Sequence, residues 1–206
     1  MRDPNYRLGL SKCEVLPDGV GVDIASRVLY ATAFPANLNS TDLIPALLVH
    51  SERPLKVALI GARPEILERA LANFRAAIPW HELIAVADGY FDKSDSGKVL
   101  ADLSAINSDI TLVGMGSPSQ EIWIDTNIRQ GHGCVVFGVG ALFDFVSGAV
   151  PRAPQVFRNL RLEWVWHLVL EPSRLRRRYV LGNPVFLFHL LRYKVFGAGW
   201  QAGLPA

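Results

Sequence analysis

Short apolar runs, each followed by a turn and then by a helical pattern, recur through the middle of the chain. The predicted strands are 55–60, 83–87, 109–113 and 134–137, and the predicted helices are 65–74, 94–106, 120–128 and 141–146. Short strands that alternate with helices are typical of parallel βαβ units. The pattern therefore predicts an α/β fold with a doubly wound, mostly parallel sheet, in which ligands bind beyond the carboxyl ends of the strands.

Another apolar stretch, Cys13–Leu16, precedes this repeating part and runs into the turn Pro17–Asp18–Gly19. Asp18 is thus expected at a strand end. Two interpretations stay open for it. An aspartate in such a turn commonly forms the turn or caps a helix. A carboxylate at the carboxyl edge of a sheet also suits a general base that takes a proton from an acceptor hydroxyl.

Glycines occupy three of the expected strand-to-helix turns, at Gly61, at Gly114 and Gly116, and at Gly138 and Gly140. Glycine lets backbone N–H groups approach an anion at a helix N-terminus. None of these loops has the spacing of a dinucleotide fingerprint or of a P-loop. One such loop is usually only a tight turn, but three along one sheet edge favour a nucleotide site.

Polar side chains beside these loops are further candidates. Gln120 and Glu121 open the predicted helix after Pro118, and Asp144 lies between two phenylalanines. Acids at a helix start are common because of the helix dipole, yet the same groups suit hydroxyls of a ribose or a sugar. The chain has no Asp-x-Asp motif. A leaving diphosphate would then be neutralised by arginines rather than by a carboxylate-bound Mg²⁺.

Positive charge is concentrated at the C-terminal end. Residues 151–206 contain nine Lys or Arg and two Asp or Glu, a net +7, whereas residues 1–150 carry about −5. The sequence therefore predicts a core over 1–150 and a basic, amphipathic helical appendage over 151–206, which attracts phosphates, nucleic acid or a membrane surface. Arg174, Arg177 and Arg178 are spaced to share one side of a helix that starts at Pro172. Two cysteines without a CxxC motif indicate a reduced, cytoplasmic compartment.

Several short motifs then occur in a characteristic order. They are Pro17–Gly21, Thr41–Leu43, Gly89–Phe91, Val113–Glu121, Gly138–Gly148, Arg152–Pro154, Leu162–Trp164 and Glu171–Tyr179. Over roughly residues 2 to 180 this ordered set resembles the WecG/TagA/CpsF family of bacterial glycosyltransferases, glycosyltransferase family 26.

The resemblance implies a Rossmann-like fold and an inverting transferase. Such an enzyme moves a sugar from a UDP-sugar to a polyprenyl-diphosphate-linked acceptor in surface polysaccharide synthesis, as a peripheral protein on the inner face of the cytoplasmic membrane. The resemblance assigns the catalytic base to Asp18 and the arginines that neutralise the diphosphate to Arg174 and Arg177. It implies catalysis without a metal or other cofactor, in agreement with the missing Asp-x-Asp motif.

Some positions depart from the family pattern. Asp3 stands where members carry the threonine of a Thr-x-Asn motif, although Asn5 matches. His167 stands where a further arginine is expected, and Ser40 and Ser119 replace a glycine and a lysine. The family's preceding strand and helix are absent from the sequence, which indicates either a misassigned start or a truncated copy.

The resulting hypothesis is a UDP-sugar-dependent hexosyltransferase with an anionic membrane surface as partner. Its expected substrate-binding residues are Asn5, Thr41, Asp42, Gly61, Gly114, Gly116, Gln120, Glu121, Gly138, Gly140, Asp144 and Arg152. A truncated, non-catalytic nucleotide-sugar-binding remnant is the alternative. Nucleic acid is not an expected partner, because the tryptophans and aliphatic residues of the basic segment suit a lipid interface better. A homo-oligomer would cover an exposed sheet edge.

Overall fold

The computed structural model describes residues 3–129, 132–133, 135–154, 157, 165–166 and 182–197. The chain divides into two compact units. Unit 1 comprises Met1–Val15 and Ser40–Pro151, and unit 2 comprises Leu16–Asn39 and Arg152–Ala206. One border thus falls beside the boundary expected near residue 150, whereas residues 16–39 join the C-terminal unit. The division into two functional domains remains a prediction.

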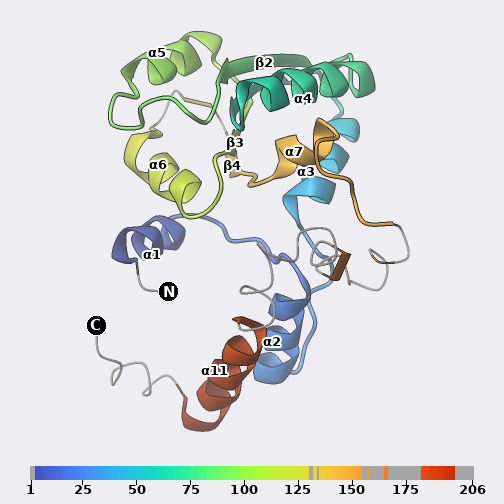
Figure 1. The fold of residues 1–206 in the computed structure, drawn as a ribbon, viewed down its shortest axis with the longest axis vertical. Coiled ribbons are helices and arrows are strands. Elements are labelled where there is room, and N and C mark those ends of the chain that lie inside the picture. The colour runs from blue at the N-terminus through green and yellow to red at the C-terminus, as the bar shows by residue number, and fades with distance from the viewer. Residues whose placement is uncertain are drawn as a thin grey trace. The chain divides into compact units, whose positions relative to one another are not determined.

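Unit 1 is built on a four-stranded parallel sheet with the strand order β2-β1-β3-β4 (Figure 1). Its strands are β1 (Lys56–Gly61), β2 (Glu82–Ala87), β3 (Ile110–Gly114) and β4 (Val135–Gly138). The chain passes from β1 to β2 on one side of the sheet and then crosses to β3 and β4 on the other. The predicted α/β class and parallel, Rossmann-like sheet are confirmed, and the four strands predicted over residues 55–137 are each present within a residue of their expected positions.

The helices of unit 1 cover both faces of this sheet. They are α1 (Pro4–Ser11), α3 (Ser40–Val49), α4 (Pro64–Ala77), α5 (Gly97–Ile106), α6 (Ser119–Asn127) and α7 (Leu142–Val146). Leu59 points into a core cluster with α3, α4 and α7, whereas its neighbour Ile60 points into a second cluster with α5 and α6. The central strands β1 and β3 are buried on both faces, which explains their nearly continuous apolar sequences.

The expected strand over 13–16 is wrong. These residues form no strand, and all four are exposed. Val15, for example, is 63% exposed. Glu14 interrupts the three apolar residues of this segment, and the segment pairs with no strand of the described sheet. An extended conformation would therefore not bury its apolar side chains. Asp18 accordingly follows a coil segment rather than the end of a strand.

Unit 2 contains α2 (Val20–Tyr30) and α11 (Gly182–Phe196), which pack against each other (Figure 1). The two helices meet near Gly21, whose Cβ position would lie 3.9 Å from the ring of Phe186, an ordinary van der Waals distance. In α11 the apolar side chains are not confined to one face, since the four consecutive residues Val185, Phe186, Leu187 and Phe188 are all exposed. Within the described part of the chain, none of the helices is both long and apolar enough to cross a membrane.

The turn that carries Asp18 is fastened to the end of the loop after α2. The Leu38 N–H donates to the Pro17 carbonyl at 2.9 Å, and the Gly19 N–H donates to Asn37 Oδ1 at 2.9 Å. Gly19 has a φ of +86° just before α2, a conformation that glycine adopts without strain. These bonds close residues 17–38 into a loop, with Asp18 exposed at its neck.

Candidate active site

β1 and β3 are neighbours in the sheet, and the chain continues from β1 to β2 on one side and from β3 to β4 on the other. Open α/β sheets bind ligands at such a reversal of strand order, beyond the carboxyl ends of the strands. Gly61 and Gly114 end these strands and pair in register. Gly61 has a φ of +126°, and a Cβ atom there would lie 2.3 Å from the Gly114 carbonyl oxygen. That oxygen accepts a hydrogen bond from the Ala62 N–H at 2.9 Å. Glycine is therefore required at residue 61 by the close approach of two backbones.

The remaining glycines at this edge differ in their surroundings. A Cβ atom on Gly114 would lie 2.7 Å from the ring of Phe143, so a side chain there would push away α7. Gly116 and Gly140 also have positive φ angles, +77° and +54°, but a Cβ atom at either position would meet no atom within 4 Å. Gly61 and Gly114 thus serve packing, whereas Gly116 and Gly140 leave room beside the edge for a ligand.

Gln120 fastens α6 to the loop after β4. Only 4% of its surface is exposed. Its Oε1 accepts from the Gly140 N–H at 3.0 Å, and its Nε2 donates to Glu121 Oε1 at 2.9 Å. Gly138 is close as well, since a Cβ atom there would lie 2.9 Å from Nε2. The Gln120 side chain therefore shapes the glycine loop from within the protein.

Glu121 has one carboxylate oxygen, Oε2, that is buried and makes no hydrogen bond within the described residues. Buried polar atoms normally have a partner. A hydrogen bond donated by a ligand hydroxyl would satisfy this oxygen. Glu121 follows Gln120, the residue that holds the glycine loop at Gly140.

Asp144 lies in α7, and the adjoining helix α4 holds the C-terminal end of α7. Arg69 Nη2 donates to the Ser147 carbonyl at 2.7 Å, and Asn73 Nδ2 donates to the Val146 carbonyl at 2.8 Å. These two bonds satisfy carbonyl groups that a helix end leaves free. Asp144 is half-buried and thus has a fixed place beside the loop at Gly138 and Gly140.

Thr41 and Asp42 begin α3 beside the same edge. The preceding Ser40 donates through Oγ to the Val139 carbonyl at 2.9 Å, which fixes the start of α3 next to the residue after β4. A serine therefore performs a structural task at the position where the family pattern has glycine.

Asn5 lies in the first turn of α1, which packs on α6. The contact is close at Gly9, whose Cβ position would be 3.4 Å from the Glu121 carbonyl oxygen. Ser117 Oγ donates to the Tyr6 hydroxyl at 3.0 Å, so the first turn of α1 is attached to the loop that contains Gly116. Asn5 itself is exposed.

The structure thus gathers eleven of the predicted residues in unit 1, around the carboxyl edge of the sheet. They are Asn5, Thr41, Asp42, Gly61, Gly114, Gly116, Gln120, Glu121, Gly138, Gly140 and Asp144. Asp18 and Arg152 belong to unit 2. Arg174 and Arg177, and the helix predicted from Pro172, lie outside the described residues. Binding and catalytic roles remain predictions for all of these residues.

Tyr90 is a further candidate, which the sequence indicates only as a member of the motif Gly89–Phe91. It follows β2 and is 74% exposed, and its N–H donates to Asp88 Oδ1 at 2.7 Å. The neighbouring Gly89 N–H donates to the Ala62 carbonyl at 2.7 Å, which brings this loop to the turn after β1. An exposed ring at this edge offers a flat surface for an aromatic base. The exposure of the Tyr90 ring is what marks it as a candidate, and this exposure can be seen only in the folded chain.

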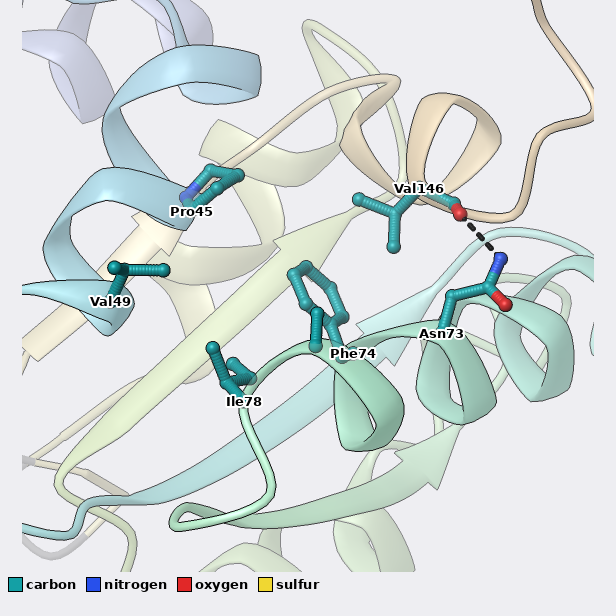
Figure 2. Close-up of a pocket in the computed structure, with 7 residues that line it drawn as sticks. Pro45, Val49, Asn73, Phe74, Ile78 and Val146 are labelled. Carbon is teal, nitrogen blue, oxygen red and sulfur yellow. Dashed lines mark hydrogen bonds between the residues drawn. The ribbon is translucent and has the colours of Figure 1, made fainter.

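An apolar hollow of about 270 Å³ lies elsewhere in unit 1, between α3, α4 and α7 (Figure 2). Its lining includes Phe74 of α4 and Ile78 just after that helix, together with Pro45 and Val49 of α3. Asn73 is its polar member and is occupied by its bond to Val146. None of the predicted site residues that the structure describes lines this hollow.

A metal site is not evident. In the parts of the chain that the structure describes, no group of three His, Cys, Asp or Glu side chains is arranged to hold a metal ion. Metal-independent catalysis remains a prediction.

A parallel sheet with a glycine-lined carboxyl edge, polar side chains around it and a separate aspartate turn is typical of enzymes that bind nucleotides. The chain belongs to the WecG/TagA/CpsF family of glycosyl transferases, whose family model matches residues 1–199. The protein is therefore a glycosyltransferase, and the resemblance inferred from the ordered motifs is confirmed.

One relative shows how far this similarity extends. The chain is 30% identical over 196 residues to the N-acetylglucosaminyldiphosphoundecaprenol N-acetyl-beta-D-mannosaminyltransferase of Bacillus spizizenii. The match covers 94% of this chain and 74% of that protein.

Proposed function

We propose that this glycosyltransferase moves a hexosyl group from a UDP-sugar to a hydroxyl of a sugar carried on a polyprenyl diphosphate, in the synthesis of a bacterial surface polysaccharide. The observation that carries the proposal is the match along nearly the whole chain to a relative named for transfer to a diphosphoundecaprenol-linked sugar. The glycine-lined edge of unit 1 supports it, because backbone N–H groups there suit a nucleotide diphosphate.

Asp18 is the proposed general base. Its carboxylate takes the proton from the acceptor hydroxyl while the oxygen attacks the anomeric carbon of the donor sugar. The bond from that carbon to the UDP oxygen breaks, UDP leaves with the bonding electrons, and the anomeric configuration inverts. The bonds from Leu38 and Gly19 support this role, because they hold the Asp18 turn in one shape before the substrate arrives.

Arginines are proposed to neutralise the leaving diphosphate in place of a metal ion. Arg152, Arg174 and Arg177 carry this role, and the planar guanidinium group suits the paired oxygens of a phosphate. No metal or other cofactor takes part in the proposed reaction.

The donor is proposed to bind along the edge of unit 1. Gly116 and Gly140 give room for the diphosphate, and the buried Oε2 of Glu121 accepts from a hydroxyl group of the ligand. Asn5, Thr41, Asp42 and Asp144 supply further hydrogen bonds to ribose or sugar. Gln120 acts by holding the loop at Gly140.

The protein is proposed to work at the inner face of the cytoplasmic membrane, where a polyprenyl-linked acceptor is embedded. The net +7 charge of residues 151–206 supports attraction to anionic lipid. Removing the residues after Pro151 should release the protein from anionic vesicles, and continued binding would contradict the anchoring role of this segment.

The test is UDP release from a panel of UDP-sugars, including UDP-N-acetylmannosamine, with a short-chain polyprenyl-diphosphate-linked sugar as acceptor. We expect release with one donor, dependent on the acceptor, and unchanged by a metal chelator. Acceptor without its sugar serves as the control for simple donor hydrolysis. Binding of UDP-sugars without release from any donor would show a nucleotide-sugar-binding protein in place of the transferase.

A further inference from the structure

Unit 2 exposes many large apolar side chains on two helices that pack together. Their exposed fractions range from 37% to 72%. They are Val22, Ile24 and Tyr30 on α2, and Val185, Phe186, Leu187, Phe188, Leu191, Val195 and Phe196 on α11. Single exposed apolar residues are ordinary, but such a concentration on one pair of helices marks an interaction surface. We call these ten residues the apolar surface of unit 2.

Within the described part of unit 2, these side chains stay exposed although α2 packs against α11. Successive helical residues point about 100° apart, so the exposed run from Val185 to Phe188 faces several directions at once. α2 meets α11 near Gly21, which accounts for one of these directions. Val22 and Ile24 follow Gly21 closely and are themselves 40% and 37% exposed.

The charges around this surface favour an anionic occupant. The exposed charges on α2 and α11 are those of Arg27 and Lys194. Helices α2 and α11 together contain a single acidic residue, Asp23, and its side chain is only 8% exposed. Arg192 lies over the rings of Phe188 and Phe196, at 5.6 and 5.9 Å from their centroids, so a cation accompanies the apolar rings.

The sequence of unit 2 as a whole has the same sign. It contains ten Lys or Arg and four Asp or Glu, a net charge of +6. A second copy of the chain that met this surface with its own unit 2 would bring an equal positive charge against the first. An anionic lipid surface instead accepts both the apolar side chains and the cations.

We propose that α2 is a membrane-docking element, which forms one lipid-binding surface together with α11. This inference rests on the proposed function in one respect, namely that the acceptor is lipid-linked. α2 begins two residues after Asp18, and the bonds to Asn37 and Leu38 hold the Asp18 turn at its start. A helix of 11 residues is about 16 Å long. Docking of α2 therefore keeps the catalytic turn at the level of the lipid headgroups, where the diphosphate of the acceptor lies.

The first experiment measures sedimentation of the full chain with vesicles of phosphatidylglycerol and phosphatidylcholine. The double variant Val22→Ser, Ile24→Ser should bind about tenfold more weakly, because it removes an exposed apolar side chain from each flank of α2, the two positions pointing about 200° apart, so that neither flank keeps its lipid contact. The matched control is Val49→Ser, which removes a valine that is 51% exposed in unit 1 and should bind as the original chain does. Equal binding by the double variant and the original chain would overturn the proposal.

A second measurement does not depend on weakened binding. A polarity-sensitive fluorophore is attached at Ile24→Cys, with Val49→Cys as the matched site, in a chain whose Cys13 and Cys134 are replaced by serine. Vesicles should shift the emission of the label at residue 24 to shorter wavelength and leave that at residue 49 unchanged. Equal emission with and without vesicles at residue 24 would contradict docking of α2.

Two further outcomes separate this proposal from its neighbours. If the double variant abolishes self-association in vesicle-free solution and leaves vesicle binding intact, the surface joins two copies of the chain and the lipid proposal is wrong. If vesicle binding depends on α2 but no donor releases UDP with a water-soluble acceptor analogue, docking stands and the proposed function fails. Release of UDP with that analogue by both the original chain and the double variant supports both.

Discussion

The edge of the sheet in unit 1 and the Asp18 loop with its helices in unit 2 are built in opposite ways. At the sheet edge, Gly61 approaches the Gly114 carbonyl more closely than a side chain would allow, and Gln120 is buried. In unit 2, Asp18 is exposed on a closed turn, and apolar side chains of α2 and α11 face outward. The fold therefore constrains the residues of the first region, whereas those of the second lie at the surface of the protein.

The largest expected effect separates chemistry from stability in unit 2. Asp18→Asn should reduce kcat by about 10³-fold, because a carboxamide cannot take the acceptor proton. Binding of UDP-sugar should stay largely unchanged, because the donor is proposed to bind along the edge of unit 1, and the melting temperature shows whether the variant is folded. Steady-state UDP release, donor binding by calorimetry and thermal unfolding measure these three quantities.

Asp95→Asn is the matched control, because Asp95 is an exposed aspartate of unit 1 and should leave kcat unaltered. Full activity of Asp18→Asn would remove Asp18 from the role of base.

A substitution at the sheet edge should instead affect mainly the stability of the folded chain. Gly61→Ala should lower the free energy of unfolding by about 3 kcal/mol or more, because its Cβ atom meets the Gly114 carbonyl at 2.3 Å and its φ is strained. Urea unfolding measures the loss. Gly116→Ala is the control, since its Cβ atom meets nothing within 4 Å and should cost only about 1–2 kcal/mol for a positive φ. Equal losses at the two glycines would show that the close backbone contact is not what constrains the edge.

Gln120→Ala tests whether this side chain acts within the protein. The Gly140 N–H would lose its acceptor, which should reduce the free energy of unfolding by about 2 kcal/mol. Gln120→Glu keeps an acceptor oxygen for Gly140 but places it beside the carboxylate of Glu121, so we expect partial recovery. Unfolding curves compare the three proteins. An unchanged stability of Gln120→Ala, with weaker donor binding, would instead indicate direct contact with the substrate.

The smallest effect is expected at the opposite end of the strands, away from the candidate site. Hydrogen bonds from the Lys56 N–H and the Arg53 side chain hold the pKa of Asp109 below its ordinary value of 3.8. A lowered pKa stabilises the folded chain at neutral pH, and this contribution is lost as the pH falls below 3.8 and through the folded-state pKa.

Asp109→Asn should therefore lower the free energy of unfolding by about 1 kcal/mol at pH 7, and by less in acid. Urea unfolding at a series of pH values, with KM for the donor measured alongside, provides the test. A stability difference that stays constant into acid would contradict the assigned cause, and a raised KM would contradict the separation of Asp109 from the site.

Much of unit 1 could be predicted because its signals are local. Residues 55–60 and 109–113 are nearly continuous apolar runs between turn residues, and they form the central strands. Tyr90 and Gln120 show the limit of such signals. The sequence indicates neither that the ring of Tyr90 faces solvent nor that Gln120 finds its partner in Gly140, because both depend on segments distant along the chain.

Spacing, order and composition along the chain are enough to predict the alternation of strands and helices, the parallel sheet, the family and the concentration of positive charge after residue 150. Three features emerge only from the folded chain: residues 16–39 belong to the same unit as α11, Cys13–Leu16 form no strand, and Gly61 is confined while Gly116 has space beside it. An apolar pattern specifies which side of a segment is to be buried, whereas the packing of the whole chain selects the partner that buries it.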